Sequence, residues 1–158
     1  MRDFNFNLAP YQTGQQVLTV RLKTDNRRRG EGIDVVMWDP DQNKLVPMKD
    51  NDTVNMDPVG DAAAVSLNKR QVRIFFAKPK PGYRFAGVGV DSAQPSGGVN
   101  TDGGKSRSVV DDLNNMNATS LGKKGEFQVY DKIWEAAKEA ASSAGYKKFL
   151  AFAGEKTT

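Results

Sequence analysis

Residues 128–144 read QVYDKIWEAAKEAASSA, and apolar side chains recur through this stretch at steps of three and four residues. This spacing places them along one stripe of an α-helix, and Gly145 supplies the residue type that commonly ends one. The stripe consists of Phe127, Tyr130, Ile133, Trp134, Ala137, Ala140, Ala141 and Ala144. We therefore expect an amphipathic helix over Gln128–Ala144 whose apolar stripe packs on a sheet.

The residues before this helix alternate as β-strands do. From 16 to 23, Leu18, Val20 and Leu22 share one face of an expected strand. The turn-forming sequence 39–43 lies between two apolar runs and predicts a hairpin, and Pro47 predicts that the second arm lies at a sheet edge. The remaining expected strands cover residues 63–67, 71–77, 83–90 and, after the helix, 146–153.

These elements predict one α+β domain over residues 1–158. We expect a mainly antiparallel sheet, or a small barrel or sandwich, of about six to seven strands, with the C-terminal helix packed on it and a final strand after the helix. Residues 91–125 are rich in Gly, Asn and Ser and predict a long loop. Within it, Ser108 as an N-cap before Val109 and Val110 predicts a short helix, with Asp111 and Asp112 in its first turn.

The composition removes several classes of enzyme. The chain has no histidine and no cysteine, so Ser-His-Asp and Cys-His nucleophile systems and thiolate metal sites are excluded. Histidine is also the side chain that titrates near neutral pH. We expect a protein that is not an enzyme and that needs no cofactor and no metal.

Two partial motif matches fail on their spacing or residue types. Residues 39–50 carry oxygen ligands at several positions of a calcium-binding loop, but Lys44 occupies the position of the required glycine. Gly98 and the run 104–106 approach a phosphate-binding loop, but five residues rather than four separate the two glycines. We interpret these segments as a hairpin turn and a glycine-rich loop.

Charge is segregated along the chain. Residues 1–30, 31–61, 62–110 and 111–158 carry net charges of +4, −6, +6 and 0 within a total of +4. Blocks of opposite sign either neutralise each other inside one fold or present complementary faces to partners. Residues 69–85 interleave six basic side chains with four aromatic ones and contain no acid, a pattern typical of sheets that bind single-stranded nucleic acid.

Two functions remain open. The first is a non-enzymatic interaction or structural module, a subunit or accessory protein of a larger assembly such as a viral particle, which associates through complementary charged faces. The alternative is a protein that binds single-stranded nucleic acid. Its phosphate- or base-binding candidates, which serve equally as partner contacts, are Arg27, Arg28, Arg29, Lys69, Arg70, Arg73, Phe75, Lys78, Lys80, Tyr83 and Arg84. Phe75 decides between the two, because it shares a strand face with Arg73 and is either covered or exposed beside positive charge.

The expected partner is protein, through self-association or a larger assembly, with nucleic acid as the second possibility and no membrane. A partner would order the glycine-rich loop through Gly97, Gly98, Gly103, Gly104, Lys105 and Arg107. The first residues contain no apolar stretch of the kind a signal peptide requires. We therefore expect a cytoplasmic protein or one within an assembled particle.

Overall fold

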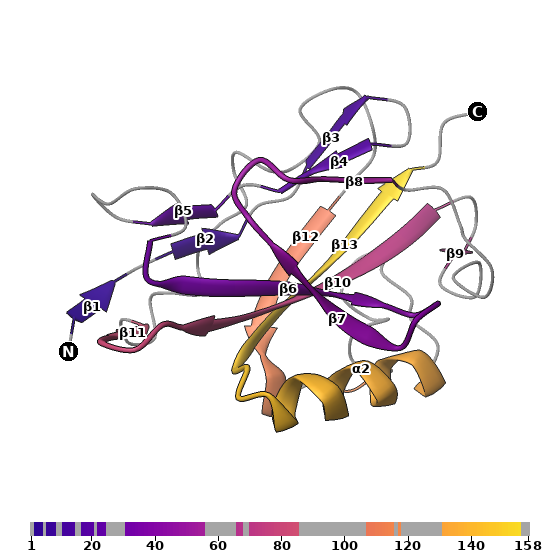
Figure 1. Ribbon diagram of the computed structural model, residues 1–158. Helices are drawn as coiled ribbons and strands as arrows, with labels where there is room; N and C mark the ends of the chain where they lie inside the picture. Colours follow the sequence, from indigo (N-terminus) through magenta and orange to yellow (C-terminus); the bar gives the residue numbers. More distant parts are fainter. Residues whose placement is uncertain are drawn as a thin grey trace.

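The computed structural model is drawn in Figure 1. It describes the chain at residues 2–4, 6–8, 11–14, 17–20, 22–24, 31–55, 66–67, 70–85, 107–115, 117 and 131–155. Side chains are described at residues 17–20, 22, 31–55, 73–84, 113–115, 117 and 132–151. None of the helices in these residues combines the length and apolar character that crossing a lipid bilayer requires.

A six-stranded antiparallel sheet forms the centre of the fold (Figure 1). Its strands are β6 (Ile33–Asp39), β7 (Lys44–Met48), β9 (Ser66–Leu67), β10 (Arg70–Pro79), β12 (Arg107–Asp112) and β13 (Lys148–Glu155). They follow the order β12-β13-β10-β6-β7, and β9 pairs with the start of β10. The expected α+β fold is confirmed, including the final strand after the helix.

The predicted hairpin is formed by β6 and β7. Oδ1 of Asp39 accepts hydrogen bonds from the backbone N–H groups of Asp41 at 2.9 Å and Gln42 at 3.3 Å. Asn43 has a φ of 51°, a left-handed conformation that asparagine tolerates. In the order of the described strands β7 is outermost, which confirms the edge position predicted from Pro47.

The helix, α2, spans Asp131–Ser143, and residues 128–130 of its expected range lie outside the described residues. It ends in a pair of backbone hydrogen bonds that satisfies two terminal carbonyls. Tyr146 N–H donates to Ala141 O and Gly145 N–H donates to Ser142 O, both at 3.0 Å. Gly145 makes this arrangement accessible because its φ is +86°.

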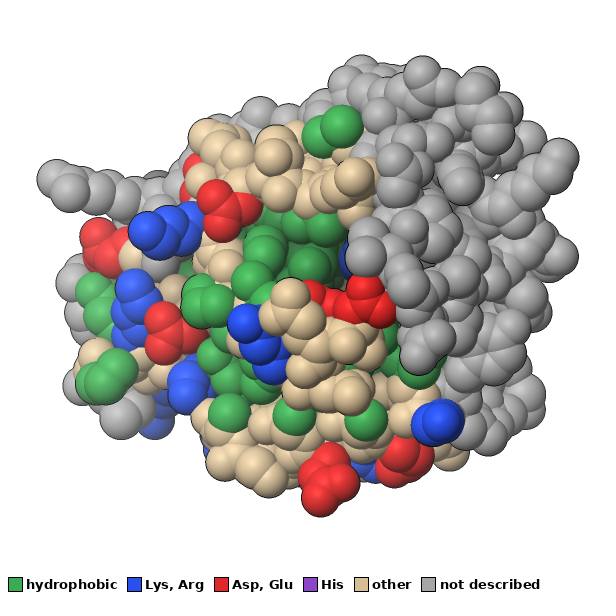
Figure 2. Space-filling view, turned by 45° about the vertical axis from the view of Figure 1, so that its right-hand side comes forward, with side chains coloured by type: hydrophobic (Ala, Val, Ile, Leu, Met, Phe, Trp, Pro, Cys, Tyr) green, Lys and Arg blue, Asp and Glu red, His purple; other side chains and the backbone are tan. Residues whose placement is uncertain are grey.

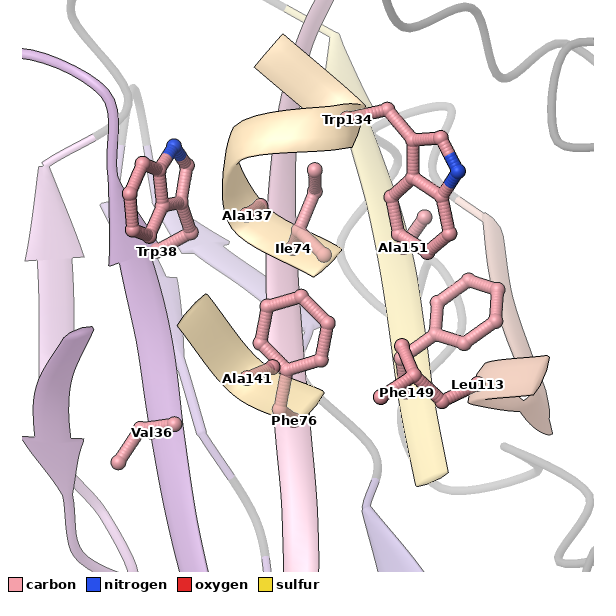
Figure 3. Close-up of a cluster of buried hydrophobic side chains, with 10 residues drawn as sticks. All are labelled: Val36, Trp38, Ile74, Phe76, Leu113, Trp134, Ala137, Ala141, Phe149 and Ala151. Carbon is pink, nitrogen blue, oxygen red and sulfur yellow. The ribbon is translucent and has the colours of Figure 1, made fainter. Parts of the chain in front are cut away.

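Helix α2 covers one face of the central sheet and encloses an apolar core, called cluster 1 here (Figure 3). Its members are Val36, Trp38, Ile74, Phe76, Leu113, Trp134, Ala137, Ala141, Phe149 and Ala151. The Trp134 ring lies 4.9 Å from the Phe149 ring and 6.4 Å from the Phe76 ring, centroid to centroid. The alanines of α2 allow the helix backbone to approach the sheet, as the sequence predicted.

The opposite face of the sheet has a core of its own, called cluster 2 here. It consists of Leu18, Val20, Leu22, Ile33, Val35, Val54, Phe75, Ala77 and Leu150. The covering residues come from β4 (Val17–Thr19), from Val20 just after it, and from β5 (Leu22–Thr24) and β8 (Thr53–Asn55). In Figure 1 these strands lie on the side of the sheet away from α2. The predicted inward face of Leu18, Val20 and Leu22 is confirmed, since each is at most 3% exposed.

Shorter strands complete the described fold. β1 (Arg2–Phe4) pairs in parallel with β11 (Tyr83–Phe85), and β2 (Phe6–Leu8) pairs with β5. β3 (Tyr11–Gly14), β4 and β8 form a three-stranded sheet. The first 24 residues therefore contribute several short strands where the sequence predicted one.

The short helix predicted from Ser108 is wrong. Residues 107–112 form strand β12, which pairs with β13 and places Val109 opposite Ala151 and Val110 opposite Leu150. A 3₁₀ turn, η3 (Leu113–Asn115), follows, and Leu113 is buried in cluster 1. Pairing with a distant strand outweighs the local capping signal, so Asp111 and Asp112 belong to a strand rather than to the first turn of a helix.

Candidate functional site

The basic and aromatic segment singled out in the sequence is central strand β10. Phe75 is 0% exposed and lies in cluster 2. The prediction that Phe75 offers a stacking surface to a base is therefore wrong. The N-terminal strands cover this face, and helix α2 covers the other.

Arg73, on the same face as Phe75, is also buried, at 8% exposed. Its Nη2 donates a hydrogen bond of 3.0 Å to the backbone oxygen of Asn55 in β8. Burial lowers the pKa of Arg73 from its ordinary value, and the charge of Asp39 acts in the opposite direction. The guanidinium ties β8 to the central sheet, and its burial contradicts the role in phosphate binding.

The two lysines that follow on the chain contact neighbouring elements. Nζ of Lys78 donates a hydrogen bond of 2.8 Å to the oxygen of Ala144, at the C-terminal end of α2, and lies 4.7 Å from the centre of the Tyr146 ring. Cations are favourable at helix C-termini. Nζ of Lys80 lies 3.9 Å from Oδ1 of Asp34, and both side chains are nearly half exposed. Lys80 therefore remains accessible to a partner.

Tyr83 packs within the fold. Its hydroxyl donates a hydrogen bond of 3.2 Å to Oε2 of Glu31. Its ring lies against Gly32, where an added Cβ would stand 2.6 Å from Cδ1 of Tyr83, and the φ of Gly32 is +82°. Arg84 is exposed. Of the candidate residues with described side chains, Lys80 and Arg84 reach the surface most fully.

The other candidate residues lie wholly or partly outside the described structure. Arg70 and Arg107 begin β10 and β12, and only their backbones are described. The candidates that lie outside the described residues are Arg27, Arg28, Arg29, Lys69, Gly97, Gly98, Gly103, Gly104 and Lys105.

The acidic and basic blocks of the chain meet inside one molecule. β6, from the acidic block, pairs directly with β10, from the basic block. The contacts Lys80–Asp34 and Tyr83–Glu31 bridge the two segments. On the face shown in Figure 2, basic and acidic side chains are interspersed around a hollow that hydrophobic side chains line. Part of the charge segregation is therefore neutralised within the fold.

A groove of about 580 Å³ lies beside the start of β6 and the end of β7. Leu22, Ile33, Pro47 and Met48 are among its apolar lining residues. Charged side chains from separate segments also line it, including Asp34, Lys49, Asp50 and Lys80. Sequence reasoning missed the groove because its residues come from five separated parts of the chain.

Tyr146 lines this groove and a second, more polar depression of about 430 Å³. The second depression includes Asn114, Ser142 and Lys147, beside the C-terminal end of α2. Burial raises the pKa of Tyr146, and the nearby carboxylate of Asp34 raises it further. The Tyr146 hydroxyl is therefore protonated, and neutral, at physiological pH.

Within the described residues, no three carboxylate side chains gather closely enough to hold a metal ion. Comparisons of the whole chain with protein-family models, with curated proteins and with solved structures found no match.

Proposed function

We propose that this chain is a non-enzymatic interaction module, a subunit or accessory protein of a larger assembly such as a viral particle, and that copies of it associate. The groove beside β6 and β7 carries this proposal. Both faces of the central sheet are occupied by the chain's own elements, whereas the groove combines apolar lining with charged side chains of both signs. Protein contacts commonly have an apolar centre within a polar rim.

The burial of Phe75 and Arg73 counts against the nucleic-acid alternative. A sheet that binds single strands needs an exposed aromatic side chain beside accessible cations. In this sheet the central aromatic residue is inaccessible, and Lys78 contacts the end of α2. No observation on the described residues favours the alternative over the assembly proposal.

Analytical ultracentrifugation tests the proposal. The full chain is sedimented over a wide concentration range in about 0.05 M and about 0.5 M NaCl, because this increase in salt shortens the range of charge interactions severalfold. We expect concentration-dependent association that weakens at high salt. A monomer at every concentration and both salt levels would refute self-association.

A pair of variants on β7 tests whether the groove is the contact. Met48 lines the groove and Val46 does not, although both are half-buried residues of the same strand. We expect Met48→Lys to weaken association at least about tenfold, and Val46→Lys to change it less. Equal effects would exclude the groove as the contact. Co-sedimentation of the wild-type chain with a mixed-sequence oligonucleotide at low salt would instead support the alternative function.

A further inference from the structure

The outer edge of β7 faces no other strand among the described residues. Such an edge is an available template for a strand of another chain, and proteins commonly protect it. Whether β7 can accept a strand depends on which of its backbone groups point outward.

The register of the β6–β10 ladder settles this direction. Lys80 N–H donates to Gly32 O at 2.8 Å, and the neighbouring pair in the β6–β10 ladder is Ile33 with Pro79. Hydrogen-bonded and non-hydrogen-bonded pairs alternate along an antiparallel ladder. Residues of β6 with even numbers therefore direct their backbone groups toward β10, and those with odd numbers direct them toward β7.

The same alternation applies across the hairpin. Val35, Met37 and Asp39 stand opposite Met48, Val46 and Lys44, so these three residues of β7 bond inward to β6. Leu45 and Pro47 consequently direct their backbone groups outward. Proline has no N–H, so Pro47 removes one of the two outward donors of β7, and its ring occupies the space where that N–H would point.

We propose that Pro47 prevents β7 from pairing with the β7 strand of a second copy. In an antiparallel pair of two β7 strands, Leu45 of one copy would stand opposite Pro47 of the other, and the bond from position 47 to the Leu45 oxygen would be lost at both symmetric positions. Lys44, the first residue of β7, and Lys49, which follows the strand, are both exposed, and their charges oppose the same approach. Association of copies therefore does not proceed by pairing β7 with β7, and the proposed contact through the groove is one between side-chain surfaces.

Substitution of Pro47 tests this inference. Pro47→Val restores the outward N–H with a residue that favours strands. Two additional backbone hydrogen bonds across the symmetric contact predict dimerisation tighter than in the wild type by about tenfold to about a hundredfold. Val46→Thr is the matched control, because it keeps a β-branched residue on β7 and adds no outward donor. Circular dichroism verifies that each variant is folded.

Two further readouts identify the contact. The new dimer is expected to persist at high salt, since backbone hydrogen bonds hold it, and the amide introduced at position 47 is expected to exchange hydrogen more slowly as concentration rises. Pro47→Ala, which restores the same N–H with lower strand preference, is expected to act in the same direction with a smaller effect. Folded Pro47→Val and Pro47→Ala that sediment as the wild type does would overturn the inference.

Failure of the role assigned to Pro47 can be distinguished from failure of the proposed function. The proposed function predicts salt-sensitive association of the wild type, whereas the present inference predicts salt-resistant association that appears only after Pro47 is replaced. If the wild type is a monomer and Pro47→Val forms a salt-resistant dimer, the role of Pro47 is supported and self-association of the native chain is refuted.

Discussion

Replacing Trp134 with phenylalanine or with alanine measures two opposing contributions at the centre of cluster 1. Trp134 is 0% exposed and contacts the rings of Phe76 and Phe149. Among the described side chains, its Nε1 is the buried polar atom without a hydrogen-bond partner. The ring therefore stabilises the fold by packing, while its N–H has lost the hydrogen bonds it would make to water.

The magnitudes distinguish the two substitutions. Trp134→Ala removes the whole ring, and such truncations cost about 3–5 kcal/mol of unfolding free energy. Trp134→Phe removes only two or so ring carbons, worth roughly 1.5 kcal/mol at about 0.8 kcal/mol each. It also removes an unpaired buried donor, which recovers about 1–3 kcal/mol. The net change for Trp134→Phe is therefore expected to lie between about 0.5 kcal/mol of destabilisation and about 1.5 kcal/mol of stabilisation.

Urea denaturation followed by far-ultraviolet circular dichroism measures both values without depending on tryptophan emission. With a slope of about 2 kcal/mol per molar urea, Trp134→Ala lowers the midpoint by about 2 M, whereas Trp134→Phe moves it by less than about 1 M. A Trp134→Phe variant as destabilised as Trp134→Ala would refute the reasoning, since it would mean that the indole N–H has a partner in solution.

Three other predictions concern stability. Arg73→Met is expected to lower the unfolding free energy by about 1–3 kcal/mol in urea denaturation, because it breaks a charge-assisted hydrogen bond to β8. An unchanged unfolding free energy would contradict this bond and would mean that the guanidinium lies in solvent. Gly32→Ala is expected to destabilise the fold more than Gly82→Ala in thermal melts, because both glycines have φ above +80° but an added Cβ meets the Tyr83 ring only at Gly32; equal melting temperatures would contradict the close contact. The pKa of Tyr146 is raised from its ordinary value of 10.0, so its contribution to stability is fully present below about pH 10 and is lost as pH rises toward the higher folded-state pKa. Wild-type stability should therefore fall more steeply above pH 10 than that of Tyr146→Phe, and parallel pH profiles would argue against the shift.

Local patterns predicted the elements whose signals lie within a few residues of one another. The helix stripe around Trp134, the stop at Gly145 and the turn after Asp39 depend on periodicity and on backbone conformation, which short segments encode. The edge position of β7 followed from the missing N–H of Pro47. The inward face of Leu18, Val20 and Leu22 followed from their alternation.

The candidate site was harder to predict, because burial depends on what covers a surface. Alternation places Phe75 and Arg73 on one face of β10 but does not indicate that β4, β5 and β8 cover that face. Residues 108–112 similarly carry a helix-capping signal, and their pairing with β13, about 40 residues further along the chain, overrides it. The groove beside β6 brings together side chains that no sequence window contains.

The amino-acid sequence by itself therefore determined the α+β class, the C-terminal helix that packs on the sheet, the hairpin with its edge strand and the absence of histidine and cysteine chemistry. Only the tertiary structure decided that Phe75 and Arg73 are interior, that acidic and basic blocks meet within one molecule, and that Pro47 directs its nitrogen away from the sheet. The physical reason is that propensity and periodicity act over a few residues. Burial, charge pairing and ladder direction are instead set by contacts between segments far apart in the chain.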